Sequence, residues 1–266
     1  MNAKNRYNDD LRLAHVLADQ ADAVTMDRFR STDLKVSAKA DHTPVTDADR
    51  SAEEIIRKQL AASRSRDSVY GEEMGTTGRS SRVWVIDPID GTKNFLRGVP
   101  VWATLIGLVE DGKVVAGVVS APALGRRWWA AQGQGAFTGT SLLRNRPIRV
   151  SQIDTLSEAS LSYSSLEGWE GAGRLNEFLD LTRQLWRTRA YGDFWSYMMV
   201  AEGTVDAAAE PELEAYDMAA LVAIVEEAGG RFTSLLGDEG PWGGHALATN
   251  GLLHDEILER LNWGDD

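Results

Sequence analysis

The 266-residue sequence contains no cysteine, so disulfide bonds, thiolate zinc sites and cysteine nucleophiles are all excluded. It also lacks any apolar run of the roughly 18 residues that a membrane-spanning helix needs. The first residues, MNAKNRYNDD, are polar and lack the apolar core of a signal peptide. These absences predict a cytoplasmic protein that does not use the membrane as a partner.

Positive charge is also scarce, because 28 Lys and Arg stand against 40 Asp and Glu, for a formal net charge of −12. This balance argues against nucleic acid or an anionic membrane as the main partner. A phosphorylated substrate would be repelled as well, unless bound metal ions reverse the local field. Hydrophobic residues make up 43% and charged residues 26%, which is ordinary for a globular enzyme.

The first half of the chain is predicted to contain two helices followed by a run of strands. Apolar residues recur at helical spacing over residues 10–30 and 46–62. Short apolar segments typical of strands follow at residues 68–70, 82–86, 103–110, 113–120 and 127–131, with a hairpin turn at Asp111-Gly112. The packed strands would leave Trp128 and Trp129 buried on opposite faces.

The second half alternates between strands and helices. Extended segments are predicted at residues 159–162, 187–192, 205–209 and 246–249, and helices at 175–185, 194–201, 218–228 and the C-terminal end. We therefore expect an α+β half over residues 1–148, followed by an α/β half over residues 149–266.

The most informative stretch is VWVIDPIDGTKNF, residues 83–95, in which an apolar strand runs into two carboxylates. Pro88 has no N–H and disfavours helical geometry at Asp87, and the following glycine permits a tight turn. Asp87, the Ile89 carbonyl and Asp90 can therefore point into one small space, and such oxygen ligands suit Mg²⁺. Taken alone, this pattern more often marks a strand end whose aspartates cap a turn or a helix.

Two other acidic positions lie at the ends of predicted elements. Glu72 and Glu73 directly follow the short strand at residues 68–70, and Asp217 begins an apolar helix. Each has an ordinary explanation, as a solvated acidic turn or as a helix N-cap. Together with the aspartate pair described above, they could form a cage for several metal ions.

Four segments resemble the inositol monophosphatase family in order and in spacing, over nearly the whole chain. They are VTDADRSAE (residues 45–53), GEE (71–73), DPIDGT (87–92) and YDMAA (216–220) with the following EAGG (227–230). The resemblance implies a layered αβαβα sandwich and a Mg²⁺-dependent phosphoric monoester hydrolase. It also implies two or three ions per active site and a homodimer.

The same resemblance implies roles for individual residues. The metal ligands would be Glu72, Asp87, the Ile89 carbonyl, Asp90 and Asp217. Glu73 would lie in the outer shell of a metal ion. Lys39 would lie near the metals and the phosphate, although a solvated loop lysine is an equal alternative.

The catalytic and phosphate-binding residues follow from the same motifs. By resemblance, Thr92 and Asp49 would position and deprotonate the attacking water, with Glu72 beside them. Gly91, Thr92 and Lys93 would offer backbone N–H groups to the phosphate, at the start of a helix.

Substrate choice in this family depends largely on the segment before the last aspartate. Asp193 and Phe194 stand where enzymes for inositol phosphate usually place a small residue. With Gly192 and Glu210 they would form an acidic, aromatic pocket that suits a cationic substrate carrying an ammonium and a ring. The run YGDFWSY, residues 191–197, is similar to that of family members that hydrolyse histidinol phosphate. Trp195 and Tyr197 could instead be core residues.

The leading hypothesis is therefore a hydrolase of histidine biosynthesis that converts L-histidinol phosphate and water to L-histidinol and phosphate. An inositol-1-phosphate or broad-specificity sugar-phosphate monophosphatase stays open as an alternative. A catalytically silent regulatory or binding relative is the alternative of another class. The intact set of acidic residues and Thr92 argues against such a silent relative.

Overall fold

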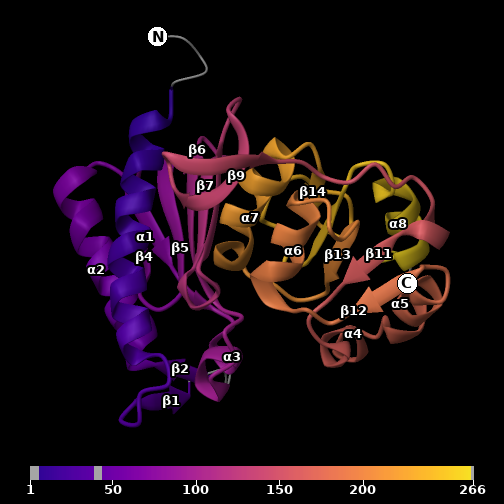
Figure 1. The fold of residues 1–266 in the computed structure, drawn as a ribbon, viewed down its shortest axis with the longest axis horizontal. Helices are drawn as coiled ribbons and strands as arrows, with labels where there is room; N and C mark the ends of the chain where they lie inside the picture. The colour runs from indigo at the N-terminus through magenta and orange to yellow at the C-terminus, as the bar shows by residue number, and fades with distance from the viewer. Residues whose placement is uncertain (1–5, 39–43, 265–266) are drawn as a thin grey trace.

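The computed structural model describes residues 6–38 and 44–264, and its layers follow the order helix, sheet, helix, sheet, helix (Figure 1). The first layer holds α1 (Asn8–Arg28) and α2 (Asp47–Ser63), the middle layer α6 (Asp193–Ala201) and α7 (Ala215–Glu227), and the last layer α4 (Leu166–Gly171), α5 (Leu175–Thr182) and α8 (His254–Leu261). The predicted αβαβα sandwich is confirmed.

The larger sheet has eight strands in the order β10-β9-β8-β7-β6-β5-β3-β4. Their bounds are β3 (Ser68–Gly71), β4 (Gly75–Thr77), β5 (Arg82–Asp90), β6 (Ala103–Glu110), β7 (Lys113–Ala121), β8 (Arg126–Ala131), β9 (Gly135–Ser141) and β10 (Arg144–Ile148). All described neighbours in this sheet are antiparallel except β3 and β5, which run parallel. The hairpin between β6 and β7 turns at Asp111 and Gly112, as predicted.

Both faces of the larger sheet are covered, because successive side chains of a strand point to opposite sides. On β6, Leu105 packs with the middle helices, whereas its neighbour Ile106 packs with α1 and α2. On β8, Trp128 and Trp129 divide in the same way, and each is at most 2% exposed. The prediction that both tryptophans pack inside the sheet layers is confirmed.

The smaller sheet has five strands in the order β12-β11-β13-β15-β14. Their bounds are β11 (Ser160–Ser162), β12 (Arg187–Arg189), β13 (Ala207–Glu210), β14 (Arg231–Thr233) and β15 (Ala246–Thr249). A separate pair, β1 (Val36–Ala38) and β2 (Pro44–Thr46), precedes α2, and the short helix α3 (Thr92–Arg97) follows β5.

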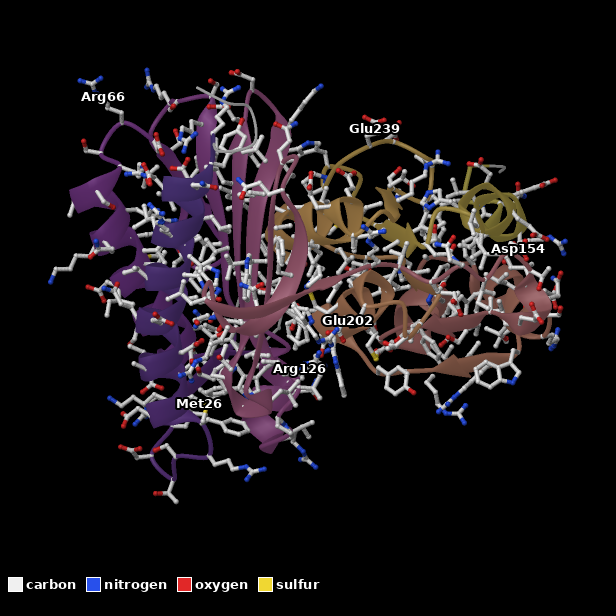
Figure 2. All side chains as sticks on the ribbon, turned by 45° about the horizontal axis from the view of Figure 1, so that its top comes forward. Met26, Arg66, Arg126, Asp154, Glu202 and Glu239 are labelled. Atoms are coloured by element: carbon white, nitrogen blue, oxygen red, sulfur yellow. The ribbon has the colours of Figure 1, made fainter. Side chains whose placement is uncertain are left out.

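A carboxylate at the end of α6 links this helix to the larger sheet. Glu202 accepts hydrogen bonds from Trp128 Nε1 at 3.0 Å and from Arg146 Nη2 at 3.4 Å, and it forms an ion pair with Arg126. Figure 2 shows Arg126 and Glu202 meeting where the two parts of the molecule adjoin. The far strands of the larger sheet are thereby fastened to the helix that begins at Asp193.

Two predicted boundaries near the acidic residues are wrong. We expected β5 to end at residue 86, but the strand continues to Asp90 through an irregularity. Asp87 pairs with Leu105 of β6, and the next paired residue of β5 is Asp90, opposite Ala103. Pro88 lies between them, where β5 does not need a backbone N–H to bond to β6. Helix α7 begins three residues earlier than predicted, because Glu214 and Asp217 form a capping box at its start.

Two glycines let α7 approach the larger sheet closely. Gly107 and Gly117 are direct partners on β6 and β7. A Cβ on Gly107 would lie 2.8 Å from the Ala219 Cβ, and a Cβ on Gly117 would lie 2.4 Å from the Ala220 carbonyl oxygen. The start of α7 therefore rests almost directly on the strand backbones, which brings Asp217 to the end of β5.

Candidate active site

Three carboxylates meet where β5 ends and α7 begins. Asp87, Asp90 and Asp217 each offer one oxygen, and these oxygens all lie within 4.8 Å of one another. The irregular end of β5 supplies the first two carboxylates, and the third residue of α7 supplies the last. Side chains far apart in the sequence are thus brought into one acidic cluster.

Burial and mutual repulsion shape the titration of this cluster. Burial raises the pKa of Asp87 and Asp90 well above the ordinary value, and nearby carboxylates raise it further. Burial raises the pKa of Asp217 to about 7. The backbone hydrogen bond from Glu214 opposes this rise, and the charge of Glu72 adds to it. Like charges this close together need a positive partner, and all the donor atoms are oxygen. The cluster therefore fits a hard divalent cation.

Each carboxylate of the cluster is oriented by one backbone N–H. The Ile89 N–H donates to Asp87 Oδ1 at 2.9 Å, the Phe194 N–H to Asp90 Oδ2 at 2.7 Å, and the Glu214 N–H to Asp217 Oδ2 at 2.8 Å. A backbone donor fixes the direction of a carboxylate without neutralising its charge. The oxygens are therefore held in place before any ligand arrives.

A threonine–aspartate pair lies beside the cluster. Thr92 Oγ1 is 3.1 Å from the Ile89 carbonyl oxygen and 3.4 Å from Asp49 Oδ1. Asp49 is fully buried, and its Oδ2 accepts hydrogen bonds from the backbone and the hydroxyl of Thr46. Burial raises the pKa of Asp49, although the Thr46 hydrogen bonds oppose that rise.

Two glutamates, Glu72 and Glu73, directly follow β3. Glu72 lines the cavity next to the aspartates, and its charge contributes to the raised pKa of Asp87. The backbone N–H of Glu73 donates to Glu53 on α2 at 2.7 Å. Lys39 lies outside the described residues.

A cavity of about 430 Å³ opens over the cluster. The first part of the chain lines it with Pro44, Glu72, Asp90, Gly91, Thr92 and Lys93, and the second part with Asp193, Phe194, Tyr197, Glu210, Glu212, Leu213, Glu214, Tyr216, Asp217 and Leu221. A molecule bound here would contact both sheet systems at once.

Asp193 and Glu210 form a second acidic group in the same cavity. Asp193 Oδ2 accepts a hydrogen bond from Asn94 Nδ2 at 2.7 Å, and the Asp193 N–H donates to Ser164 Oγ at 3.0 Å. The Ser164 hydroxyl donates in turn to Glu210 Oε2 at 2.6 Å. Burial raises the pKa of Asp193 to about 6 and that of Glu210 to about 8.

The start of α6 has an unusual backbone. Gly192 has φ 86° and Asp193 has φ 49°, a left-handed conformation that is uncommon for a residue other than glycine. The Phe194 ring is buried against Trp128, with ring centroids 6.1 Å apart. Tyr197 is also buried, in the core between the sheets, and it is among the residues that line the cavity.

Three residues that shape the site were not predicted from the sequence. Asn94 and Ser164 hold the Asp193–Glu210 group, and Thr46 holds Asp49. For Thr46 a signal was present, because T-x-x-D before a helical run is a capping pattern. No local pattern marks Ser164, since its partners come from distant segments.

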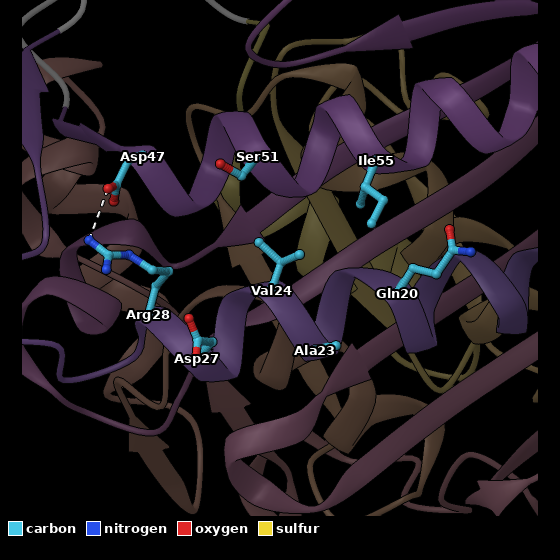
Figure 3. Close-up of a pocket in the computed structure, with 8 residues that line it drawn as sticks. All are labelled: Gln20, Ala23, Val24, Asp27, Arg28, Asp47, Ser51 and Ile55. Atoms are coloured by element: carbon cyan, nitrogen blue, oxygen red, sulfur yellow. Dashed lines mark hydrogen bonds and ion pairs between the residues drawn. The ribbon is translucent and has the colours of Figure 1, made fainter.

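A second hollow, of about 660 Å³, lies between α1 and α2 (Figure 3). Arg28 Nη2 and Asp47 Oδ2 form an ion pair of 2.9 Å at one end, and Val24 and Ile55 line the middle. One of its two carboxylates is thus already paired with arginine. This hollow lacks the grouped acids of the cavity described above.

Comparisons with known proteins agree with this geometry. Residues 8–262 match the model of the inositol monophosphatase family. The chain is 65% identical over 260 residues to a protein of Streptomyces coelicolor named histidinol-phosphatase, with 96% of this chain and 98% of the relative covered. It is 57% identical over 258 residues to the histidinol-phosphatase of Mycobacterium tuberculosis, with 97% and 99% covered.

Solved structures share the fold. The chain superposes on an inositol monophosphatase from Zymomonas mobilis with a TM-score of 0.85 and 33% identity, over 97% of this chain and 99% of that one. It superposes on a Thermotoga maritima IMPase with a TM-score of 0.85 and 31% identity, over 96% and 97%. Among residues 6–38 and 44–264, no helix has the length and hydrophobicity of a membrane span.

Proposed function

The chain belongs to the inositol monophosphatase family, and we propose that it hydrolyses L-histidinol phosphate to L-histidinol and phosphate, a step of histidine biosynthesis. One observation carries this choice of substrate. Two carboxyl groups, the partly buried Asp193 and the buried Glu210, line the same cavity as the acidic cluster. The names of two relatives that cover 96% and 97% of the chain support the same substrate.

We propose Mg²⁺ as the cofactor, with two or three ions per active site. The ligands would be Glu72, Asp87, the Ile89 carbonyl, Asp90 and Asp217, whose oxygen atoms suit a hard cation. Bound Mg²⁺ would supply the positive charge that attracts a phosphate to this acidic protein, and it would lower the pKa of a water molecule. Glu73 and Lys39 remain proposed outer-shell residues.

The chain's own contribution to water activation would come from Thr92 and Asp49. The Thr92 hydroxyl would take a proton from the attacking water and pass its own proton to Asp49, which lies 3.4 Å away. Because burial raises the pKa of Asp49, this carboxylate accepts a proton more readily than an exposed aspartate does. Backbone N–H groups of Gly91, Thr92 and Lys93 would hold the phosphate oxygens.

Recognition of the alcohol part would depend on the second acidic group. Asn94 donates to Asp193 and Ser164 donates to Glu210, and because both donors are neutral, neither supplies a counter-charge. The substrate's ammonium would supply the missing counter-charge. Gly192 permits the turn that presents Asp193, and Phe194 forms an apolar wall next to it.

Phosphate release from three esters tests the proposal. We would compare L-histidinol phosphate, inositol 1-phosphate and an aryl phosphate, each with Mg²⁺ and with excess chelator. A charge-assisted hydrogen bond contributes about 1.5–3 kcal/mol, so kcat/KM should favour histidinol phosphate over inositol 1-phosphate by at least about tenfold. Equal values would indicate a broad-specificity phosphatase, and no turnover of any ester would indicate a silent relative.

We also propose a homodimer located in the cytoplasm, without nucleic acid or membrane partners. The net charge of −12 supports the last two points. Sedimentation velocity of the purified protein tests the dimer, since one species at twice the mass of 29.2 kDa is expected.

A further inference from the structure

Glu53 is a fully buried carboxylate on α2 that has no part in the function proposed above. Its Oε2 accepts the Glu73 N–H at 2.7 Å, and its Oε1 accepts the Met74 N–H at 3.2 Å. Arg57 Nε, one helical turn further on, is 2.6 Å from Oε1. A buried charge is tolerated when it is paired and hydrogen-bonded in this way, so its contacts indicate what it holds.

The segment that Glu53 holds is the turn that carries Glu72. The Glu72 N–H donates to the Ile86 carbonyl oxygen of β5 at 3.1 Å, and the next two N–H groups donate to Glu53. Three successive backbone donors are therefore fixed, one by the sheet and two by α2. The backbone on both sides of the Glu72 side chain cannot shift without breaking one of these bonds.

Arg57 secures the far end of the same turn. Its guanidinium donates to the Gly75 carbonyl oxygen and, at 3.1 Å, to Thr77 Oγ1. Gly71 secures the near end, because a Cβ at this position would lie 2.2 Å from Glu53 Oε1. The chain thus passes Glu53 at a distance that only glycine allows.

One face of α2 carries both buried acids that serve the cavity. Asp49 and Glu53 are four residues apart, so their side chains project from the same face, and both are fully buried. Asp49 reaches Thr92, whereas Glu53 reaches the Glu72 turn. A single helix therefore sets the distance between the two parts of the site.

We propose that Glu53 is a positioning residue that places the Glu72 carboxylate for a divalent metal ion. It acts through the backbone of the turn and does not touch the substrate. The inference rests on the proposed metal site, but it does not depend on which phosphate ester is cleaved.

The test is metal binding by the variant Glu53→Gln, measured without substrate. A glutamine amide keeps the shape of the side chain, but it loses the ion pair with Arg57 and presents an NH₂ group to a backbone N–H. We expect the affinity for Mg²⁺ by calorimetry, and for Mn²⁺ by electron paramagnetic resonance, to fall by about ten- to a hundredfold. Glu54→Gln is the matched control, since this neighbour on α2 is exposed and should bind metal normally.

Kinetics separate positioning from a general loss of structure. At saturating Mg²⁺ we expect Glu53→Gln to recover kcat to within a few-fold, with KM for the ester unchanged. A folded variant with a lower melting temperature but normal metal affinity would overturn the proposal. If Glu53→Gln does not fold, Arg57→Gln takes its place, and normal metal affinity in that folded variant would equally overturn it.

The double variant with Glu72→Gln asks whether Glu53 acts through Glu72. In the Glu72→Gln background, Glu53→Gln should cause no further loss of metal affinity, because the ligand that it positions is already altered. Additive losses would show that Glu53 acts elsewhere and would overturn the proposal. Because these metal-binding measurements contain no ester, they can be interpreted even if the histidinol phosphate assignment is wrong.

Discussion

The cavity contains two acidic groups that differ in what surrounds them. Asp87, Asp90 and Asp217 face one another within 4.8 Å, and each is oriented by a backbone N–H. Asp193 and Glu210 are instead held by the side chains of Asn94 and Ser164. The first group concentrates charge at one point, whereas each carboxyl group of the second has a neutral side chain as its partner.

This difference teaches how one acidic cavity can serve two purposes. A concentrated cluster suits a small, doubly charged metal ion, since several oxygens can reach it together. Two carboxyl groups from different elements, α6 and β13, suit an organic cation, since each can accept a hydrogen bond from a different part of it. The predictions below change one group at a time.

The largest effect is expected from Asp90→Asn. Loss of one cluster charge should lower kcat/KM by about a thousandfold or more, because metal ions contribute several kcal/mol to stabilising the transition state. The same change should raise the melting temperature of the metal-free protein, since it removes repulsion among the clustered carboxylates. Near-normal activity in Mg²⁺, measured by phosphate release, would contradict the ligand assignment.

Thr92→Ala should have the next largest effect. If Thr92 activates the water as proposed, loss of the hydroxyl should lower kcat by about 10²–10⁴-fold with little change in KM, because only the chemical step is affected. Thr92→Ser keeps the hydroxyl and should retain most of the activity. Steady-state kinetics that show only a raised KM for Thr92→Ala would instead make this residue a ligand of the bound phosphate.

Changes to the second acidic group should depend on the substrate. Asp193→Asn and Glu210→Gln should each raise KM for histidinol phosphate by about ten- to a hundredfold, since a charge-assisted hydrogen bond is lost. Hydrolysis of an aryl phosphate should hardly change. The exposed Glu212 at the cavity rim provides a matched control, Glu212→Gln, with little effect on either ester.

The outcome that contradicts this prediction is a loss of the same size on both esters. Such a result would mean that the variants disturb the metal ions or the fold. No loss on either ester would return the protein to the broad-specificity alternative.

The smallest effect concerns the stability of the metal-free protein against pH. Burial raises the pKa of Glu210 to about 8 in the folded state, whereas an unfolded glutamate titrates near about 4.3. The contribution of Glu210 to the free energy of unfolding is therefore fully present below about pH 4. It decreases as the pH rises from there and is lost once the pH has passed through about 8. The melting temperature with excess chelator should fall between pH 5 and 8.5, by about 2–4 °C for each kcal/mol lost.

Variants at the same position check the origin of this slope. Glu210→Gln should flatten the fall of the melting temperature with pH, while Glu212→Gln should follow the unmodified protein. An unchanged slope in Glu210→Gln would show that Glu210 stays ionised in the folded protein.

The acidic cluster was predictable only in part from the residues themselves. Asp87 and Asp90 are close in the sequence, so their local pattern predicts a shared space. Asp217 joins them through the packing of α7 on the sheet, which no local pattern reveals, and only the family resemblance connected it. Ser164 and Glu53 escaped prediction for the same reason, since their partners come from distant segments.

The fold shows the same limit. Segments with a clear apolar period, such as β6 and α2, were predicted nearly to the residue. Strands β4 and β10 were missed because most of their residues are exposed and carry no apolar alternation. Their strand conformation depends on pairing with a neighbour, and a neighbour's position is a property of the whole fold.

The glycines beneath α7 have a consequence for how the site can change in evolution. Gly107 and Gly117 carry no charge, but the absence of their side chains lets the helix contact the strand backbones directly. A methyl group on either would lift the helix and carry Asp217 away from the other two aspartates. Substitution of either glycine should therefore impair the site as much as loss of one of its acids. A search for inactivating substitutions that examines only charged residues would overlook these two positions.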